Sequence, residues 1–280
     1  MKLFNRITII GLGLIGGSLA LAIREKKLAK EITGVSRRKS TIDRAVENKI
    51  VDSATLNLKD GVKGSDLVII AAPVLRIPDI AKRLAPFLRK DAILTDAGST
   101  KRYIVKNIEK TGFKGVNFAG SHPIAGSEKS GIKSANKDLF KGTCCILTKT
   151  KNTNPKVIAR LKKFWGGLGM RVKVMSPEAH DRLFSNISHL PHAASVSLAN
   201  SAGKDGLKLA AGGFKDTTRI ASGEPELWKD IFLTNRDNLI KDIEVLKKEL
   251  SKMQMALKNS DESGLLKLLG NAKAIRDSLQ

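Results

Sequence analysis

The sequence predicts an α/β protein with a doubly wound parallel sheet in its N-terminal part and only helices in its C-terminal part. Three observations support this prediction. A glycine motif joins the first apolar strand to a helix, strand and helix patterns alternate as far as residue 176, and no strand pattern follows. Alternating strands and helices are typical of parallel sheets covered by helices. We therefore place the domains at residues 1–176 and 177–280.

The predicted strands of the first part are short apolar runs between turn signals. The run "DLVIIAAP" at 66–73 is continuously apolar, as expected of a strand buried on both faces. The other strand segments are 7–10, 31–36, 92–98, 144–148 and 171–176, and the short segment 51–55 follows a helix at 41–49. Helices are also expected after the glycine motif, at 77–88, from 101 and at 155–169, and residues 120–131 are expected to form a glycine-rich loop that carries His122.

The second part begins with Pro177, which opens a helical stretch to about residue 202. A glycine-rich bend follows, and Pro225 stands in the first turn of the next helix. Further on, apolar residues alternate spacings of four and three, which is a heptad seam. The seam is either the core of the helical domain or a partner surface, and we expect a homodimer. It consists of Leu239, Ile243, Leu246, Leu250, Met253 and Leu257, and a final helix begins near Asp261.

The chain of 280 residues carries a formal net charge of +23. The basic residues are dispersed, without a long basic block or a basic strand interleaved with aromatic residues, so we expect no nucleic-acid partner. Small anionic substrates remain compatible with this charge.

The cysteine pattern and the apolar segments indicate the cellular compartment of the protein. Cys144 and Cys145 are adjacent, and no CxxC or metal-ligand spacing exists, which favours a reduced, cytoplasmic protein without a bound metal. The basic start and apolar run of residues 1–23 resemble a signal peptide. Glycines interrupt that run at a meaningful spacing, so we expect a folded strand, turn and helix there, and no membrane partner.

Gly11, Gly13 and Gly16 form the pattern GxGxxG between the first strand and its helix. In this context the pattern indicates a Rossmann-type dinucleotide site. The first glycine allows the tight turn, the second lets the backbone approach a pyrophosphate, and the third lets helix and strand pack closely. The first-turn residues Leu14 and Ile15 complete the predicted loop, whose helix N-terminus attracts phosphate.

The residues that follow the second predicted strand indicate which dinucleotide binds. An NAD site usually carries an acidic residue there for the ribose 2′-hydroxyl. This chain has Ser36, then Arg37, Arg38 and Lys39. A guanidinium can bind a 2′-phosphate with two hydrogen bonds, so we favour NADP over NAD as cofactor. The alternative is that this basic run is only solvated surface.

Five segments together resemble the prephenate/arogenate dehydrogenases of tyrosine biosynthesis. The glycine motif is generic, whereas the other segments are specific, and the resemblance covers nearly the whole chain. It implies a Rossmann domain, a helical dimerisation domain, and an NAD(P)-dependent oxidative decarboxylation of prephenate or arogenate. The segments are "GLGLIGGSLALAI", "TDAGSTK", "GSHPIAGSEKSG", "ISHLPHA" and "GGFKDTTRIASGEPELWKDIFLTN".

The resemblance also implies roles for individual residues. His122 matches the catalytic histidine, which suits a base because its reference pKa of ~6.5 lies near working pH. Ser99 matches the serine that bonds this histidine beside the nicotinamide, although it could instead cap the following helix. Arg219 and His192 match residues that bind substrate, and Glu128 matches an acid suited to contact that arginine. Ala72 and Pro73, in "AAP", match residues that line the cofactor.

Several alternatives remain open at this stage. His189 and His192 could be packed residues or half of a metal site, but no Cys or acid completes a set, and His180 is read as structural. A β-hydroxyacid dehydrogenase, a pyrroline-carboxylate reductase or a non-catalytic NADP-binding sensor could share the glycine motif. The choice between prephenate and arogenate also stays open: "HLPH" favours prephenate, whereas "GVSRRKST" resembles NADP-using arogenate enzymes.

Overall fold

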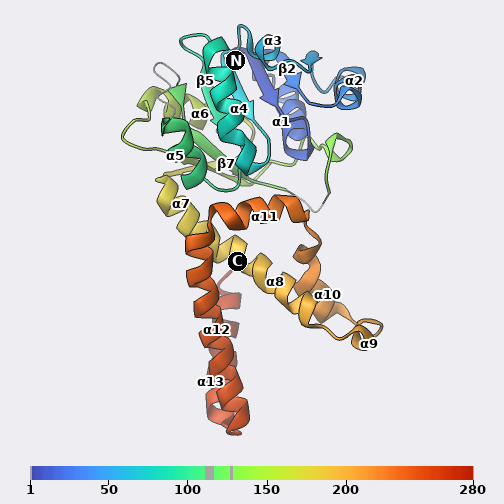
Figure 1. Ribbon diagram of the computed structural model, residues 1–280, viewed down its shortest axis with the longest axis vertical. Helices are drawn as coiled ribbons and strands as arrows, with labels where there is room; N and C mark the ends of the chain where they lie inside the picture. Colours follow the sequence, from blue (N-terminus) through green and yellow to red (C-terminus); the bar gives the residue numbers. More distant parts are fainter. Residues whose placement is uncertain (1, 111–116, 127–128, 280) are drawn as a thin grey trace. The chain divides into compact units, whose positions relative to one another are not determined.

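The computed structural model describes residues 2–110, 117–126 and 129–279 of the chain (Figure 1). The chain divides into two compact units, Met1–Asn235 and Arg236–Gln280. The α/β part and the first helices that follow it therefore belong to one unit. The domain division at residue 176 stays a prediction.

A six-stranded parallel sheet forms the centre of the first unit. Its strand order is β3-β2-β1-β4-β5-β6, and every neighbouring pair runs parallel. The order reverses direction between β1 and β4, which is the topological switch point where such sheets bind ligands. The strands are β1 (Phe4–Ile10), β2 (Ala29–Val35), β3 (Ser53–Thr55), β4 (Leu67–Ile70), β5 (Ile93–Asp96) and β6 (Asn117–Phe118).

Both faces of this sheet are buried, as the apolar run at 66–73 predicted. Leu67 and Ile69 of β4 belong to one core cluster, while Val68 and Ile70 belong to the other. Alternate residues of a strand point to opposite faces, so β4 contributes to both layers. The first layer is completed by α1 (Leu14–Glu25) and α6 (Pro155–Gly167), and the second by α4 (Ile77–Leu84) and α5 (Arg102–Lys110).

Two further short helices complete the α/β part. They are α2 (Lys39–Glu47) and α3 (Leu58–Val62), which contact β2 and β3. Short 3-10 turns η1 (Val74–Arg76), η2 (Ala85–Phe87) and η3 (Ile132–Ser134) lie in the connections. The predicted positions of helices and strands are thus correct to within a few residues.

The last three strands do not extend the parallel sheet, which differs from the simple alternation read from the sequence. The strands β7 (Gly120–Ile124), β8 (Cys144–Thr148) and β9 (Arg171–Met175) form a separate sheet in the order β7-β8-β9. β7 pairs antiparallel with β8, and β8 pairs parallel with β9. The two sheets meet at β5 and β7, where the hydroxyl groups of Thr95 and Ser121 lie 2.6 Å apart.

The helices after β9 include an irregular stretch. α7 (Pro177–Phe184) passes into a π-helical segment (Ser185–His189) and then into α8 (Leu190–Ser201). Such π segments occur frequently at functional sites. The short helices α9 (Lys204–Leu207) and α10 (Gly212–Thr218), the turn η5 (Arg219–Ser222) and α11 (Pro225–Thr234) complete the unit, and α11 contacts η1.

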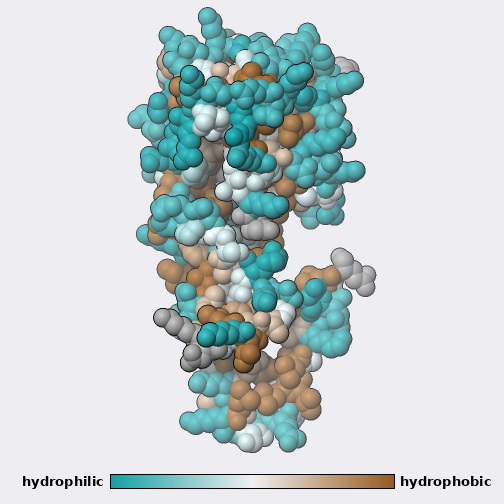
Figure 2. Space-filling view, turned by 90° about the vertical axis from the view of Figure 1, so that its right-hand side faces the viewer, coloured by the Kyte–Doolittle hydropathy of each residue, from teal (hydrophilic) through white to brown (hydrophobic). Residues whose placement is uncertain are grey.

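The second unit is a pair of helices in contact, α12 (Arg236–Lys258) and α13 (Glu262–Asp277). Asp261 caps α13 by accepting a hydrogen bond from the Gly264 amide at 2.9 Å. The predicted seam runs along α12, but only its first residue, Leu239, is buried, and Leu250 and Leu257 are 58% and 60% exposed. Hydrophobic side chains gather over the helical segments in the lower half of Figure 2, whereas hydrophilic ones cover the α/β part.

Candidate active site

The glycine motif builds a tight turn between β1 and α1. Gly11 has a φ of +96°, and a Cβ on it would lie 2.1 Å from the carbonyl oxygen of Ala71. A Cβ on Gly16 would lie 1.8 Å from the carbonyl oxygen of Gly11. Both positions therefore require glycine, Gly11 for its left-handed conformation and Gly16 for the close approach of helix to strand.

Gly13 is different, because a Cβ there would meet nothing within 4 Å. It stands at the N-cap of α1 without a side-chain cap, and the first turn of that helix holds no acidic residue. The amides of Leu14, Ile15 and Gly16 are in this first turn. An uncapped helix N-terminus beside open space is suited to bind a phosphate group, so these residues fit a dinucleotide.

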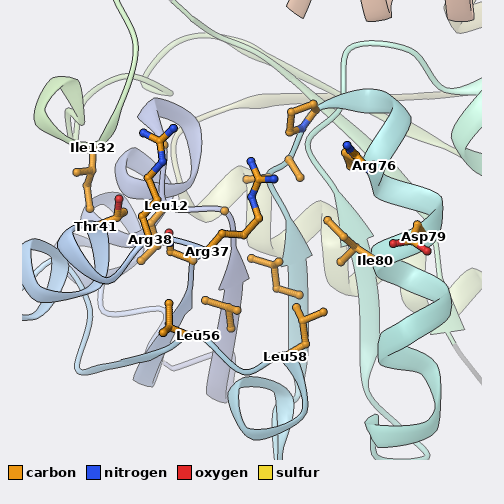
Figure 3. A pocket seen from close by; sticks show the side chains of 18 of the residues that line it. Leu12, Arg37, Arg38, Thr41, Leu56, Leu58, Arg76, Asp79, Ile80 and Ile132 are labelled. Atoms are coloured by element: carbon orange, nitrogen blue, oxygen red, sulfur yellow. Dashed lines mark hydrogen bonds between the residues drawn. The ribbon is translucent and has the colours of Figure 1, made fainter. Parts of the chain in front are cut away.

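A cavity of about 500 Å³ opens at this turn. It lies at the carboxyl ends of β1, β2 and β4. Figure 3 shows Arg37 and Arg38 on one side of the cavity and Ile80, Asp79 and Arg76 on the other. Of the predicted cofactor residues, Gly11, Gly13, Ser36, Arg37, Arg38, Ala72 and Pro73 line the cavity, whereas Leu14, Ile15, Gly16 and Ser99 do not.

The charge at the β2 end of the cavity is positive. Ser36, Arg37, Arg38 and Thr41 line this end together, and the guanidinium groups of both arginines are exposed to the cavity side. The acidic residue on its wall, Asp79, belongs to α4 and pairs with Arg83 at 3.9 Å. The β2 end therefore offers hydrogen-bond donors to an anion.

His122 lies within β7 and not on a loop, which corrects the sequence-based expectation. It is half-buried and pairs in register with Ile146 of β8. Its Nδ1 is 2.8 Å from Nε2 of His180, and its Nε2 has no hydrogen-bond partner among the described residues. Burial lowers the pKa of His122 well below its ordinary value, with further lowering by the nearby His180, Lys101 and His189. At neutral pH the imidazole is thus an uncharged proton acceptor.

The contact continues from His180 to a carboxylate. His180 is fully buried, and its Nδ1 lies 2.7 Å from Oδ1 of Asp181. Asp181 in turn accepts hydrogen bonds from the amides of Lys101 at 2.7 Å and Arg102 at 2.9 Å. These amides begin α5, so a residue of α7 caps α5. Ser99, which the sequence offered as a cap, does not fill that role.

A buried ion pair lies beneath β7. The side chains of Asp96, at the end of β5, and Lys101 are both fully buried and form a salt bridge. Lys101 Nζ also donates to the carbonyl of Ser121 at 2.8 Å, and the Ser121 amide donates to Asp96 Oδ1 at 3.2 Å. The pair therefore holds both backbone groups of the residue that precedes His122.

The remaining predicted site residues are less closely tied to His122. Ser99 is half-buried after β5, and the described part of the chain contains no hydrogen bond between it and His122. His192 is buried and stacks on Trp228, with ring centroids 3.5 Å apart and planes 10° apart. Its Nδ1 has no partner among the described residues. Arg219 is exposed at the start of η5, and Glu128 lies outside the described residues.

Sequence reasoning missed four residues of this site. The sequence indicates a structural role for His180 and assigns no role to Asp181, Asp96 or Lys101. In the sequence, His180 and Asp181 are consecutive residues of a predicted helix with no feature that marks them as a site. The segment "TDAGSTK" contains Asp96 and Lys101 but does not show that they form an ion pair. A signal was present nonetheless, since a lysine and an aspartate flanking a buried strand end require partners if they are buried.

No group of three or more His, Cys, Asp or Glu side chains within the described ranges could hold a metal ion. No helix of those ranges is long and apolar enough to cross a membrane.

An uncapped helix N-terminus at a switch point, a cavity beside it and an uncharged histidine at the adjoining sheet define a class of enzyme. They are the parts of an NAD(P)-dependent dehydrogenase with a Rossmann-type domain and a helical region.

Comparisons with known proteins agree with this class. Residues 19–174 match the family model described as "Prephenate dehydrogenase, nucleotide-binding domain", and residues 176–271 match "Prephenate dehydrogenase, dimerization domain". The chain is 35% identical to the prephenate dehydrogenase of Bacillus subtilis, across 98% of this chain and 76% of that protein.

Two solved structures are similar over nearly their whole length. The prephenate dehydrogenase of Aquifex aeolicus, in complex with hydroxyphenyl propionate and NAD+, has a TM-score of 0.91 and 36% identity, covering 99% of this chain and 98% of that one. The arogenate dehydrogenase of Synechocystis has a TM-score of 0.84 and 31% identity, covering 98% and 100%.

The chain belongs to the prephenate dehydrogenase family. This confirms the family, the fold class and the NAD(P)-dependent dehydrogenase activity that the sequence predicted. Membership of this family excludes the three alternatives of a β-hydroxyacid dehydrogenase, a pyrroline-carboxylate reductase and a non-enzymatic sensor.

The buried ion pair generates a prediction about stability. Lys101→Met leaves the Asp96 carboxylate buried without its counter-charge, which should lower the free energy of unfolding by about 3–5 kcal/mol. Urea unfolding measures this change. Asp96→Asn combined with Lys101→Met removes both charges and should recover part of the loss.

The matched control for this prediction is Lys137→Met. Lys137 pairs with Glu25 at 3.2 Å, with about half of each side chain exposed, so its loss should change the stability by less than about 1 kcal/mol. Equal stabilities of the Lys101→Met and Lys137→Met variants would contradict a structural role for the buried pair.

Proposed function

We propose that this chain catalyses the oxidative decarboxylation of prephenate to 4-hydroxyphenylpyruvate, with hydride transfer to NAD(P)+, in tyrosine biosynthesis. The observation that carries the proposal is the environment of His122, whose Nδ1 is engaged by His180 and whose Nε2 is left to accept a proton. The prephenate dehydrogenases among its relatives support the same substrate. Arogenate is the second candidate, favoured by the 31% identity to the Synechocystis arogenate dehydrogenase.

The reaction requires a base next to the C4 hydroxyl of the cyclohexadienyl ring. When bound, NAD(P)+ supplies the acceptor for the hydride that leaves C4. As C4 gains carbonyl character, the hydroxyl proton moves to Nε2 of His122. The bond between C1 and its carboxylate then breaks, CO2 leaves, and the electron pair makes the ring aromatic. The oxygen on C4 becomes a phenolate and recovers the proton from His122, so atoms and charges balance.

Four further residues are proposed to complete the site around the substrate and the nicotinamide. Arg219 would bind a carboxylate, because its guanidinium is exposed and forms no ion pair with another described residue. His192 would contribute a second polar contact from its stack on Trp228. Glu128 would contact Arg219, as the family resemblance implies. Ser99 would orient His122 and the nicotinamide when the cofactor is bound.

We further propose that NADP is preferred over NAD. The support is local: Ser36, Arg37 and Arg38 follow β2 at a place where an NAD site usually carries an acid. The cofactor in the Aquifex aeolicus structure is NAD+, so the preference rests on these residues of the present chain. Two free cysteines, Cys144 and Cys145, support the proposal of a cytoplasmic enzyme.

A homodimer through α12 is also proposed. The second half of the heptad seam, Leu250, Met253 and Leu257, is exposed, although heptad seams are normally buried. The match of residues 176–271 to a domain described as a dimerization domain supports a second copy as the partner.

The cofactor preference can be tested at Arg37. Arg37→Ala should weaken NADP binding roughly tenfold or more, because a charge-assisted hydrogen bond to the 2′-phosphate is worth about 1.5–3 kcal/mol. NAD binding should remain nearly unchanged, since NAD has no phosphate there. Fluorescence titration of both cofactors measures the two affinities, and equal losses for both would reject the proposal.

The dimer can be tested on the exposed part of the seam. Leu250→Lys should convert the dimer to a monomer in sedimentation experiments, because a charge would replace an apolar contact in the interface. Ser251→Lys, one residue along and off the seam, is the matched control and should remain a dimer. A monomeric wild-type chain, or a Leu250→Lys variant that stays dimeric, would contradict this interface.

The chemistry can be tested by comparing His122 and Arg219. His122→Asn should lower kcat by about 10²–10⁴ with little change in KM, because a general base acts in the transition state. Arg219→Ala should mainly raise KM for the substrate, by roughly tenfold or more, since a contact to a charged group is worth about 1.5–3 kcal/mol. NADPH absorbance in assays with prephenate and with arogenate measures both variants and identifies the preferred substrate.

The pH profile supplies a further readout for the same variants. Activity requires neutral His122, so it is present above the histidine pKa and lost as the pH falls through it. Because burial lowers that pKa, the acid limb of kcat/KM should lie below pH 6.5. A near-normal kcat in His122→Asn, or an unchanged KM in Arg219→Ala, would reject the assigned roles.

A further inference from the structure

A row of side-chain contacts runs from His122 through His180 to Asp181. His180, in the middle of this row, is a polar residue to which the proposed reaction assigns no role. His180 is fully buried, and both of its ring nitrogens are engaged. Nε2 faces Nδ1 of His122 at 2.8 Å, and Nδ1 faces Oδ1 of Asp181 at 2.7 Å. Its ring stacks on Phe184, with centroids 4.5 Å apart and planes 29° apart. The ring can neither rotate nor flip without losing these contacts.

The direction of the hydrogen bonds in this row is determined by Asp181, the residue at its end. Oδ1 of Asp181 accepts the Lys101 amide, and Oδ2 accepts the Arg102 amide. Both amides lie at the N-terminus of α5, where the helix dipole favours a negative charge. Asp181 therefore acts as an acceptor with both of its oxygens.

The proton positions follow from this anchor. If Asp181 accepts, then Nδ1 of His180 must donate, and the neutral ring keeps its lone pair on Nε2. That lone pair can accept only from Nδ1–H of His122. The second nitrogen of His122, Nε2, is then left with its own lone pair and without a proton. Burial lowers the pKa of His180 to about 2, so this ring stays neutral throughout the working pH range.

We propose that His180 is a positioning residue, anchored by Asp181, that holds His122 in the tautomer whose Nε2 accepts a proton. The opposite neutral tautomer carries its proton on Nε2 and could not take one from a hydroxyl group. An aspartate that selects the tautomer of a catalytic histidine is a known device in triads of serine proteases. Here a second imidazole is inserted between the carboxylate and the base.

The other charged and titratable groups around His122 are compatible with this tautomer. Lys101, beneath β7, is already committed to Asp96 and the Ser121 carbonyl. His189 contacts Nδ2 of Asn235 through its Nδ1 at 3.1 Å and burial lowers its pKa to about 4. Within the described residues, neither side chain forms a hydrogen bond with the His122 ring that would compete with His180.

The first experiment observes the tautomer directly and does not depend on activity. The chain has four histidines, so ¹⁵N-histidine labelling gives a small set of ring signals that single His→Gln substitutions can assign. The nitrogen shifts of His122 in the free wild-type protein should show a protonated Nδ1 and an unprotonated Nε2. In His180→Leu this pattern should be lost. A protonated Nε2 in the wild type, or an unchanged pattern in His180→Leu, would overturn the proposal.

The second experiment separates positioning from a merely structural role. His180→Leu removes the acceptor and should lower kcat by about 10²-fold, because the base is misplaced or in the wrong tautomer. His180→Gln offers a side-chain carbonyl to Nδ1 of His122 and should retain most of kcat. Both variants should bind NADP as the wild type does, since His180 does not line the cavity. Equal losses of kcat in the two variants, parallel to their melting temperatures, would indicate a structural role and overturn the proposal.

The kinetic part rests on the proposed function, whereas the tautomer measurement does not. A chain that oxidises neither prephenate nor arogenate but shows the expected tautomer would overturn the proposed substrate and leave the role of His180 intact. An active chain with the opposite tautomer would overturn the role of His180 alone.

Discussion

The salt bridge between Asp96 and Lys101 connects the end of β5 and the start of α5 to β7 of the second sheet. Asp96 ends β5, Lys101 precedes α5, and both bind the backbone of Ser121 in β7. Two buried charges cost several kcal/mol of desolvation each, which is repaid only when good geometry and further hydrogen bonds satisfy both groups. The backbone of Ser121 supplies those hydrogen bonds, so the second sheet and the first stabilise the same ion pair.

The active-site side chains are arranged around this ion pair. The amide, carbonyl and hydroxyl groups of Ser121 all form hydrogen bonds. Its hydroxyl oxygen lies 2.6 Å from the hydroxyl oxygen of Thr95 and accepts a hydrogen bond from Nε1 of Trp165 at 3.2 Å. His122 follows directly, so its backbone has little freedom. The same Lys101 contributes its amide to Asp181, which anchors His180. One lysine thus positions His122, the proposed base, through the backbone of Ser121 and through the row of side chains from Asp181 to His180.

Burial gives the histidines of this protein a common property. The pKa values of His122, His180, His189 and His192 are all lowered, in each case mainly by desolvation. A neutral imidazole can accept a proton or a hydrogen bond, while an imidazolium can only donate. The imidazoles of β7, α7, the π-helical segment and α8 are therefore uncharged at neutral pH, whereas the β2 end of the cavity carries the positive charges of Arg37 and Arg38. This combination suits an anionic substrate that must lose a proton.

Much of this site was predictable from sequence because its determinants are local. The pattern GxGxxG between a strand and a helix depends on backbone space, and the structure places Gly11 and Gly16 where a Cβ would clash. Arg37 and Arg38 follow β2 and line the cavity for the same local reason. His122 was predicted as the base from the segment around it, which the sequence places on a loop and the structure places in β7.

The sequence by itself determined the parallel sheet and the glycine turn of the cofactor loop, and it predicted His122 as the base, since each rests on residues close together in the chain. Only the tertiary structure decided the separate β7-β8-β9 sheet, the contacts of the Asp96–Lys101 pair with Ser121 and the row from His122 to Asp181. Strand direction in a sheet and the partner of a buried charge are set by contacts across long stretches of chain: 58 residues separate His122 from His180, and 80 separate Lys101 from Asp181. No periodicity or motif encodes such distances, because the energy that fixes them comes from burial and hydrogen bonding in the folded state.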